Sequence, residues 1–326
     1  MSERTLVTGA LGFLGREVVR ALTTAGHIVR ATDRAPGADL FLPDFRPADI
    51  LREESVAGLF DDVSSVVHVA GLAHVFDRPS AASAPFMAVN AEGTERVARL
   101  AAQAGVRRFV LISSVSVYGI GKEAVTTEDS PCLPKSPYAL SKLVAEQRAA
   151  EVASRTGMAV TILRLATLYG EEDPGNLLRL LKSVDSGRFR WVGSGTNRKS
   201  LLYRGDAASA CVAALGGSAT GVRVYNVTAA PCTMREIVEG MAAALERPVP
   251  RARVPAAPVL WGAAGLSHLP LIGGRFAGLH DTLLKWLAED AYDGSRFAME
   301  CRFTPQMPLR EGLRREAAWF RSGMQV

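Results

Sequence analysis

The first half of the chain alternates short apolar runs with longer stretches in which apolar residues recur every three or four positions. Such runs are typical of buried strands, and the periodic stretches are typical of helices that pack on a sheet. Strands are predicted at Thr5–Thr8, Ile28–Thr32, Ser65–Ala70, Phe109–Ile112 and Val160–Leu163. Helices are predicted between the first strand and Gly26, and at about residues 53–60, 94–104 and 138–156. This alternation predicts right-handed βαβ crossovers and an α/β fold with a doubly wound parallel sheet.

The pattern becomes less regular after Tyr169. It predicts helices at about residues 177–184 and 206–215, a glycine-rich loop or hairpin at 187–200, and a strand at Val224–Val227. Thr233–Glu236 has the capping-box pattern that begins a helix, which should run to about Leu245. We therefore expect a dinucleotide-binding domain over residues 1–170, which the chain rejoins at about 201–230. Residues 171–326 are expected to form a smaller, mixed α/β substrate lobe laid across the strand ends.

Composition excludes several classes of protein. With 326 residues, 48% of them hydrophobic and 22% charged, the chain should fold as a globular protein. Its four cysteines lie far apart with no C-x-x-C spacing, which argues against a metal site or a disulfide framework and favours the cytoplasm. No export signal is visible, and the apolar stretch Val254–Leu266 is too short and proline-rich to span a membrane. The net charge of +5 comes from scattered arginines, so we expect no nucleic-acid partner.

A glycine turn separates the first strand from the first helix. In Thr8–Gly15 the glycines permit a tight turn and let a pyrophosphate approach the backbone N–H groups at the start of the helix. Asp33 ends the second strand 18 residues after Gly15, at the place where a carboxylate binds the ribose of NAD. The adjacent Arg34 could receive the 2′-phosphate of NADP. The sequence therefore predicts a Rossmann-type site for NAD, with NADP as the alternative.

A second motif joins Tyr138 to Lys142, which share one helix face because they are four residues apart. An ammonium beside a phenol could lower the phenol's pKa and make it a usable acid and base near neutral pH. Upstream, Ser113, Ser114 and Ser116 follow a buried strand, at the edge of the sheet where a substrate would lie. His68 lies in an apolar strand and is interpreted as a packed histidine rather than a catalyst.

With these motifs the chain resembles, over nearly its whole length, the extended short-chain dehydrogenases/reductases, in particular the NAD-dependent epimerase/dehydratase group that acts on nucleotide sugars. The resemblance makes Ser114, Tyr138 and Lys142 the catalytic residues. Together with the glycine turn, it places the cofactor against Gly9, Leu11, Gly12, Phe13, Leu14, Gly15, Asp33, Arg34, Asp49, Ile50, Ala70, Gly71, Asn90, Tyr138 and Lys142. It places the substrate against Ser114, Ser116, Tyr138, Asn176, Arg198 and Lys199.

Departures from the family pattern narrow the expected reaction. Val115 and Ser116 stand where 4,6-dehydratases carry an acidic pair, and neither side chain can act as a carboxylate acid or base. Lys199 stands where hexose epimerases carry a diphosphate-binding arginine. The resemblance therefore implies chemistry at carbon 4 of a nucleotide-diphosphate sugar, with a 4-epimerase favoured over an NAD(P)H-dependent keto-sugar or other carbonyl reductase. A non-catalytic dinucleotide-binding protein is the third alternative, and a homodimer is expected.

Overall fold

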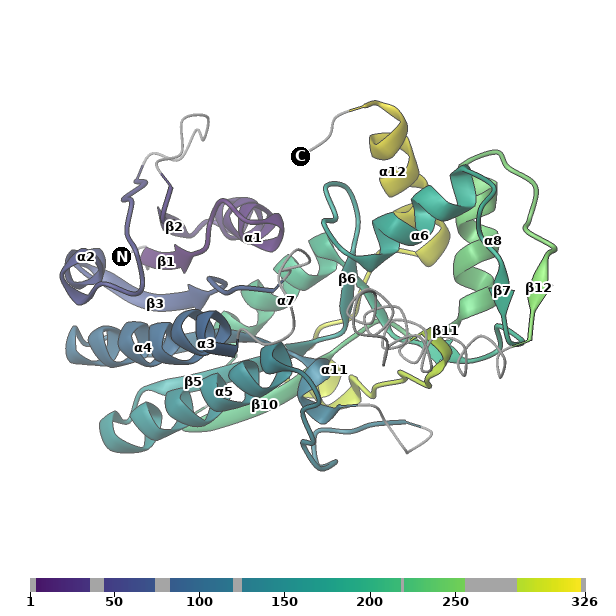
Figure 1. Cartoon of the computed structure of the whole chain (residues 1–326). Coiled ribbons are helices and arrows are strands. Elements are labelled where there is room, and N and C mark those ends of the chain that lie inside the picture. Colours follow the sequence, from purple (N-terminus) through teal and green to yellow (C-terminus); the bar gives the residue numbers. More distant parts are fainter. Residues whose placement is uncertain are drawn as a thin grey trace.

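The computed structural model describes residues 4–35, 44–73, 83–119, 125–217, 220–255 and 286–323. Its centre is a six-stranded sheet in which every neighbouring pair is parallel, in the order β10-β5-β4-β3-β1-β2 (Figure 1). The strands are β1 (Arg4–Thr8), β2 (Ile28–Thr32), β3 (Val63–His68), β4 (Arg108–Ser114), β5 (Ala159–Leu165) and β10 (Val222–Val227). The predicted parallel α/β sheet is confirmed.

The strand order reverses direction at β1. From β1 the chain goes outward to β2, and it then crosses to the other side of β1 to form β3. In open parallel sheets a ligand binds outside the carboxyl ends of the strands at such a switch point. The glycine turn follows β1, so the fold places it at this point.

Helices cover both faces of the sheet (Figure 1). On one face α1 (Phe13–Thr24) packs against α7 (Arg204–Gly216), and their apolar sides share a buried core with β1 and β5. On the other face α4 (Gly93–Gln103) packs against α5 (Pro137–Thr156) over a second core. The shorter helical segments before α4 and α5 are α2 (Glu53–Val56), η1 (Ala57–Leu59), α3 (Ser83–Phe86), η2 (Met87–Glu92) and η3 (Val115–Tyr118).

The second half of the chain adds a lobe at the end of the sheet toward which the strands point (Figure 1). Helices α6 (Asn176–Asp185), α8 (Met234–Ala244) and α12 (Leu309–Arg321) enclose a separate core that includes Leu181, Met241 and Leu313. The predicted capping box at Thr233 is present at the start of α8. The lobe also contains β6 (Thr167–Tyr169), β7 (Trp191–Val192), β8 (Arg198–Lys199), β9 (Leu201–Tyr203), β11 (Cys232–Thr233), β12 (Arg253–Val254) and α11 (Ser295–Glu300).

The hairpin alternative for residues 187–200 is wrong. Two short strands do form there, but β7 pairs with β12 and β8 pairs with β11. Local sequence carries no signal for partners that lie more than 30 residues away. Most of the apolar segment 254–274 lies outside the described residues.

Two further expectations concern membrane-spanning helices and the cysteines. Within the described part of the chain no helix is long and apolar enough to cross a membrane. The four cysteines are free, as their spacing predicts.

Candidate active site

The glycine turn has the geometry that its sequence predicts. Gly9 has a φ of +67°, and a Cβ built on it would lie 2.7 Å from the backbone of Ala70. A Cβ on Gly15 would lie 1.9 Å from the carbonyl oxygen of Gly9. Only glycine fits at these two positions, because the obstructing atoms are backbone and cannot rotate away. Leu14 is buried in α1, while Gly12 is the N-cap and has no capping side chain. The first N–H groups of α1 are thus available to an anion.

Asp33 faces the glycine turn from the end of β2. One carboxylate oxygen accepts the backbone N–H of Leu11 at 3.0 Å, and the other accepts that of Arg34 at 2.7 Å. A carboxylate has about four acceptor positions, so two remain for ribose hydroxyls. The Arg34 side chain is exposed beside it.

Ala70 and Gly71 form the opposite wall, directly after β3. A Cβ on Gly71 would come within 3.0 Å of the Lys142 Nζ atom and 3.1 Å of the Asn90 Oδ1 atom. The missing side chain therefore lets the turn after β3 lie against Lys142.

Asn90 is fully buried, and its amide is already occupied by protein groups. Its oxygen accepts the Leu72 N–H at 2.7 Å, and its nitrogen donates to the Leu72 carbonyl and the Ser141 hydroxyl. Both amide hydrogens are used within the protein, whereas the amide oxygen keeps one acceptor position, so contact with the cofactor stays a prediction. Asn90 fixes the turn after β3 to the start of α5.

Asp49 and Ile50 lie beyond β2, where the resemblance places the adenine. The Asp49 carboxylate accepts the N–H of Leu51 at 3.0 Å. Ile50 is buried and packs against Gly93, and its carbonyl accepts a hydrogen bond from Arg96. These contacts hold the segment in place. Contact between this segment and the adenine stays a prediction.

Tyr138 and Lys142 are positioned by the way α5 begins. The Ser136 hydroxyl caps the helix by accepting the Ala139 N–H, and Pro137 occupies the first helical position. Tyr138 is therefore fixed in the first turn, and the Phe86 ring packs edge-on against its ring at 6.2 Å between centroids. Lys142 follows one turn later on the same face and is buried.

Ser114 completes the group from the carboxyl end of β4. Its oxygen accepts the Ser116 N–H at 3.2 Å, and the same hydroxyl is hydrogen-bonded to Tyr138. The pKa of Tyr138 is nevertheless raised, because burial disfavours the phenolate more than this hydrogen bond favours it. The expectation that Lys142 lowers the pKa of this phenol is therefore wrong for this structure. The Lys142 ammonium instead donates to the carbonyl of Ile112 at 2.9 Å.

Lys142 has a lowered pKa of about 8, because burial disfavours its charged form and Glu146 only partly offsets that effect. His68 lies near enough to be affected by the same ammonium. Burial, aided by Lys142, lowers the pKa of His68 to about 3, so it is neutral at physiological pH. Its ring nitrogens are hydrogen-bonded to the hydroxyls of Thr8 and Thr94. The interpretation of His68 as a packed histidine is confirmed.

The sequence analysis missed a buried polar network that begins one helical turn after Lys142. Glu146, one turn after Lys142, accepts two hydrogen bonds to separate oxygens from Arg164, at 3.0 and 2.6 Å. Arg164 also donates to the hydroxyl of Tyr118, which in turn donates to Asn226 at 2.7 Å. The spacing of four between Lys142 and Glu146 was visible in the sequence, whereas the partners of Glu146 were not.

The residues predicted to bind the substrate differ in whether protein groups already occupy their polar atoms. The Ser116 hydroxyl is buried and has no hydrogen-bond partner among the described residues. Asn176 is the first residue of α6. Lys199 is not a free cation facing the cleft, because its ammonium is paired with Asp290 at 2.6 Å and donates to the carbonyl of Ala288. Arg198 is paired with Glu289 at 3.5 Å.

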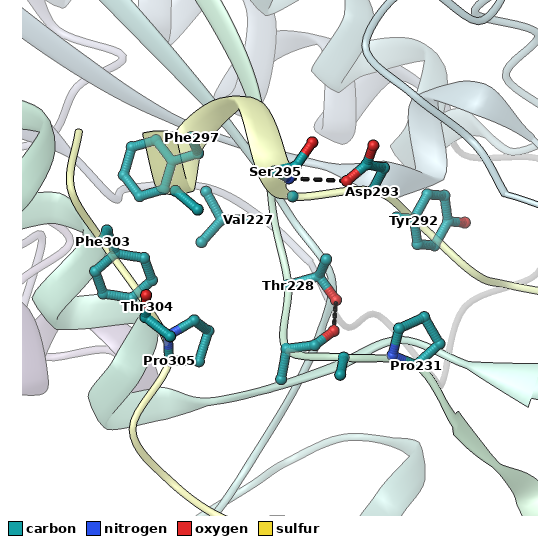
Figure 2. Close-up of a pocket in the computed structure, with 14 residues that line it drawn as sticks. Val227, Thr228, Pro231, Tyr292, Asp293, Ser295, Phe297, Phe303, Thr304 and Pro305 are labelled. Carbon is teal, nitrogen blue, oxygen red and sulfur yellow. Dashed lines mark hydrogen bonds between the residues drawn. The ribbon is translucent and has the colours of Figure 1, made fainter. Parts of the chain in front are cut away.

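A separate pocket of about 220 Å³ lies where β10 ends. Figure 2 shows Phe297, Phe303 and Pro305 on one side of it and Tyr292 on the other. None of Ser114, Tyr138 or Lys142 lines it, so it is distinct from the catalytic group. In the described part of the chain, no cluster of histidine, cysteine or acidic residues could hold a metal ion.

The model of the NAD dependent epimerase/dehydratase family matches residues 5–228. The chain belongs to this family. UDP-glucose 4-epimerase of Vibrio cholerae is 29% identical, and the match covers 98% of this chain and 96% of that protein. 2-Alkyl-3-oxoalkanoate reductase of Stenotrophomonas maltophilia (strain K279a) is also 29% identical, covering 96% and 98%. The solved structure of MoeE5 in complex with UDP-glucuronic acid and NAD has a TM-score of 0.77 and 28% identity, covering 98% of this chain and 100% of that one.

The residues of this family member fit its dinucleotide cofactor. The cradle at Gly9 and Gly15 would be filled by any side chain, and that at Gly71 lies beside the Lys142 ammonium. The carboxylate of Asp33 stands at the ribose end of the turn, where it disfavours a 2′-phosphate. These features are those of an NAD-dependent enzyme.

Proposed function

We propose that this enzyme is a 4-epimerase of a nucleotide-diphosphate sugar and uses NAD that stays bound between turnovers. The observation that carries the proposal is the group formed by Ser114, Tyr138 and Lys142 at the carboxyl ends of the strands, next to the glycine turn. A hydroxyl, a phenol and an ammonium in this order can remove a proton from an alcohol and hold the oxygen that results.

In the proposed reaction Tyr138 accepts the proton of the hydroxyl on carbon 4, and Ser114 donates a hydrogen bond to the same oxygen. When bound, NAD accepts the hydride from carbon 4 and later returns it. Lys142 would donate hydrogen bonds to the nicotinamide ribose, which would draw its ammonium away from the Ile112 carbonyl. In that position the positive charge of Lys142 would oppose the rise in the pKa of Tyr138. Once the keto-sugar has turned over in the site, Tyr138 would return the proton to the oxygen on carbon 4, and hydride supplied by bound NAD to the opposite face would invert that carbon.

The test uses the purified protein without added cofactor. Acid-released NAD is measured, and the protein is incubated with UDP-glucose and with UDP-N-acetylglucosamine, with products followed by proton NMR. We expect retained NAD and interconversion of 4-epimers. The Tyr138→Phe variant should keep its affinity for NAD and lose about 10²–10⁴-fold in rate. Unchanged turnover in this variant would remove Tyr138 from the mechanism.

A reductase is the second candidate, favoured by the similarity to the Stenotrophomonas reductase. The same residues can deliver a proton and a hydride to a ketone that arrives from solution. Protein purified without bound NAD that oxidises NADH or NADPH in the presence of a 4-keto-sugar or another ketone would establish this alternative. A dehydratase is disfavoured, because Val115 is buried and apolar and Ser116 carries no carboxylate.

The diphosphate of the substrate is proposed to lie near Asn176, Arg198 and Lys199. The Ser116 hydroxyl, which has no hydrogen-bond partner among the described residues, supports a contact with the sugar. Because Lys199 is paired with Asp290, diphosphate binding requires the ammonium to be shared or released. A homodimer and a cytoplasmic location also remain proposals, the first testable by light scattering during gel filtration and the second by cell fractionation.

A further inference from the structure

The feature behind this inference is a row of polar side chains across three neighbouring strands. Ser113 on β4, Arg164 on β5 and Asn226 on β10 are in register with one another. All three side chains are buried, although polar side chains inside a sheet are costly unless they are hydrogen-bonded. Their partners come from α5 and η3, so the row links five elements at the end of the sheet where the catalytic group lies.

Glu146 is the centre of this row. Its side chain is buried, and Arg164 holds it through both carboxylate oxygens. The Ser113 hydroxyl donates a third hydrogen bond to the oxygen that accepts the Arg164 Nε–H. A buried carboxylate with this many donors is fixed in position by charge-assisted hydrogen bonds.

The position of Glu146 relative to Lys142 gives it a second role. The two residues are four apart on α5 and therefore share one helix face. The Lys142 ammonium is buried, and the one hydrogen bond that the structure gives it is to a neutral carbonyl. Glu146 is the group whose charge favours the ammonium. Arg164, which is paired with the same carboxylate, also donates to the Tyr118 hydroxyl, so the network holds both side chains in place.

We propose that Glu146 is a positioning residue of this enzyme, which keeps Lys142 charged and in place although the lysine is buried. The proposal rests on the proposed catalytic role of Lys142. It adds that Arg164, Ser113 and Tyr118 support catalysis indirectly, because they hold the Glu146 carboxylate in position. Loss of the carboxylate should therefore affect activity most at alkaline pH, where an unsupported lysine loses its proton.

Other titratable groups lie beside Lys142 or in the network around Glu146, and their charges affect how the test is interpreted. His68 from β3 is neutral above about pH 5, since its pKa is about 3. Tyr118 from η3 has a pKa raised by burial to about 12, and Arg164 from β5 stays charged. Tyr138 on α5 is the remaining group, and its own ionisation also affects activity. The ionisation of Lys142 must therefore be read directly.

The direct measurement is a pH titration of the lysine side-chain signals by ¹H–¹³C NMR in protein with ¹³C-labelled lysine. The chain has only six lysines, so the signal of Lys142 can be assigned by its loss in Lys142→Arg. In Glu146→Gln we expect this signal to titrate at least one pH unit lower than in the wild type. Epimerase kcat/KM should then fall about sixfold more at pH 8.5 than at pH 6.5, because a one-unit fall from a pKa of about 8 removes most of the protonated lysine at the higher pH and little at the lower.

Glu151→Gln is the matched control, because it removes the same charge from an exposed position of α5 that is also paired with an arginine. It should leave the Lys142 titration unchanged. Should Glu146→Gln alone prove too unstable because it leaves Arg164 buried without its partner, the double variant Glu146→Gln with Arg164→Gln removes both charges. Its Lys142 signal should still titrate below that of the wild type, by less than in the single variant.

The outcomes separate this inference from the proposed function. An unchanged Lys142 titration in Glu146→Gln and in the double variant, or a loss of activity that is equal at both pH values, overturns the role of Glu146. A wild-type protein without activity on any nucleotide sugar overturns the proposed function, while the NMR titration still tests the interaction between Glu146 and Lys142.

Discussion

Glu316 should make the protein less stable as pH rises, and its replacement by glutamine should remove this dependence. The residue lies on α12 and has no exposed surface. Neither of its carboxylate oxygens completes a hydrogen bond with a described residue. Burial, reinforced by the nearby Asp173, raises its pKa to about 9, and the amide of Gly170 lowers it only in part. In the folded protein the group is therefore protonated at neutral pH.

The sign and size of the effect follow from proton linkage. In the unfolded chain Glu316 titrates near its ordinary pKa of 4.5, whereas the folded chain keeps the proton to about pH 9. Between these values the folded state holds the extra proton, so the free energy of unfolding falls as pH rises. The loss is about 1.4 kcal/mol per pH unit, which reaches about 3 kcal/mol at pH 7 as an upper limit. Glutamine has nearly the same size and no charge, so it avoids this loss.

The assay is urea unfolding of wild type and Glu316→Gln at pH 5, 7 and 8.5. The variant should match the wild type at pH 5 and be more stable by about 1–3 kcal/mol at pH 7, with a larger difference at pH 8.5. Glu311→Gln is the control on the same helix. Its side chain is partly exposed and paired with Arg314 and Arg315, which lower its pKa to about 2, so its loss should destabilise slightly or not at all. A stability difference between Glu316→Gln and wild type that stays constant with pH would refute the reasoning.

Three further predictions concern the cofactor and the substrate. Gly15→Ala should abolish NAD binding in a fluorescence titration, because its Cβ would collide with the Gly9 backbone, whereas Gly58→Ala, where a Cβ meets nothing within 4 Å, should bind normally; normal binding by both would mean that the turn adapts. Wild type should bind NAD more tightly than NADP because of Asp33, and at least tenfold tighter binding of NADP, about 1.4 kcal/mol, would show that Arg34 prevails. Lys199→Ala and Arg198→Ala, tested singly, should raise KM for the nucleotide sugar more than they weaken NAD binding; equal small changes would place this turn outside the diphosphate site.

Local sequence was enough to predict the elements of the first domain, since each signal lies within one element. Apolar runs and helical periodicity predicted β1 to β5 and α5 to within a few residues. The glycines of the turn could be interpreted from their place between a predicted strand and a predicted helix. The structure gives the physical reason for them, because neighbouring backbone atoms leave no room for side chains there. Tyr138 and Lys142 could be paired because a helix fixes the spacing between its own residues.

Only the tertiary structure decided what surrounds these groups, because burial and charge partners depend on contacts between distant segments. Asn90 is hydrogen-bonded to Leu72 and Ser141, partners that the sequence could not show. Lys199 faces Asp290, 91 residues away, so the sequence could not show that its charge is already paired. Glu146 meets Arg164 because α5 packs against β5, and Glu146 in turn affects the pKa of Lys142. A sequence can thus predict which chemical groups an element carries, but their charge states are set by the neighbours that folding brings to them.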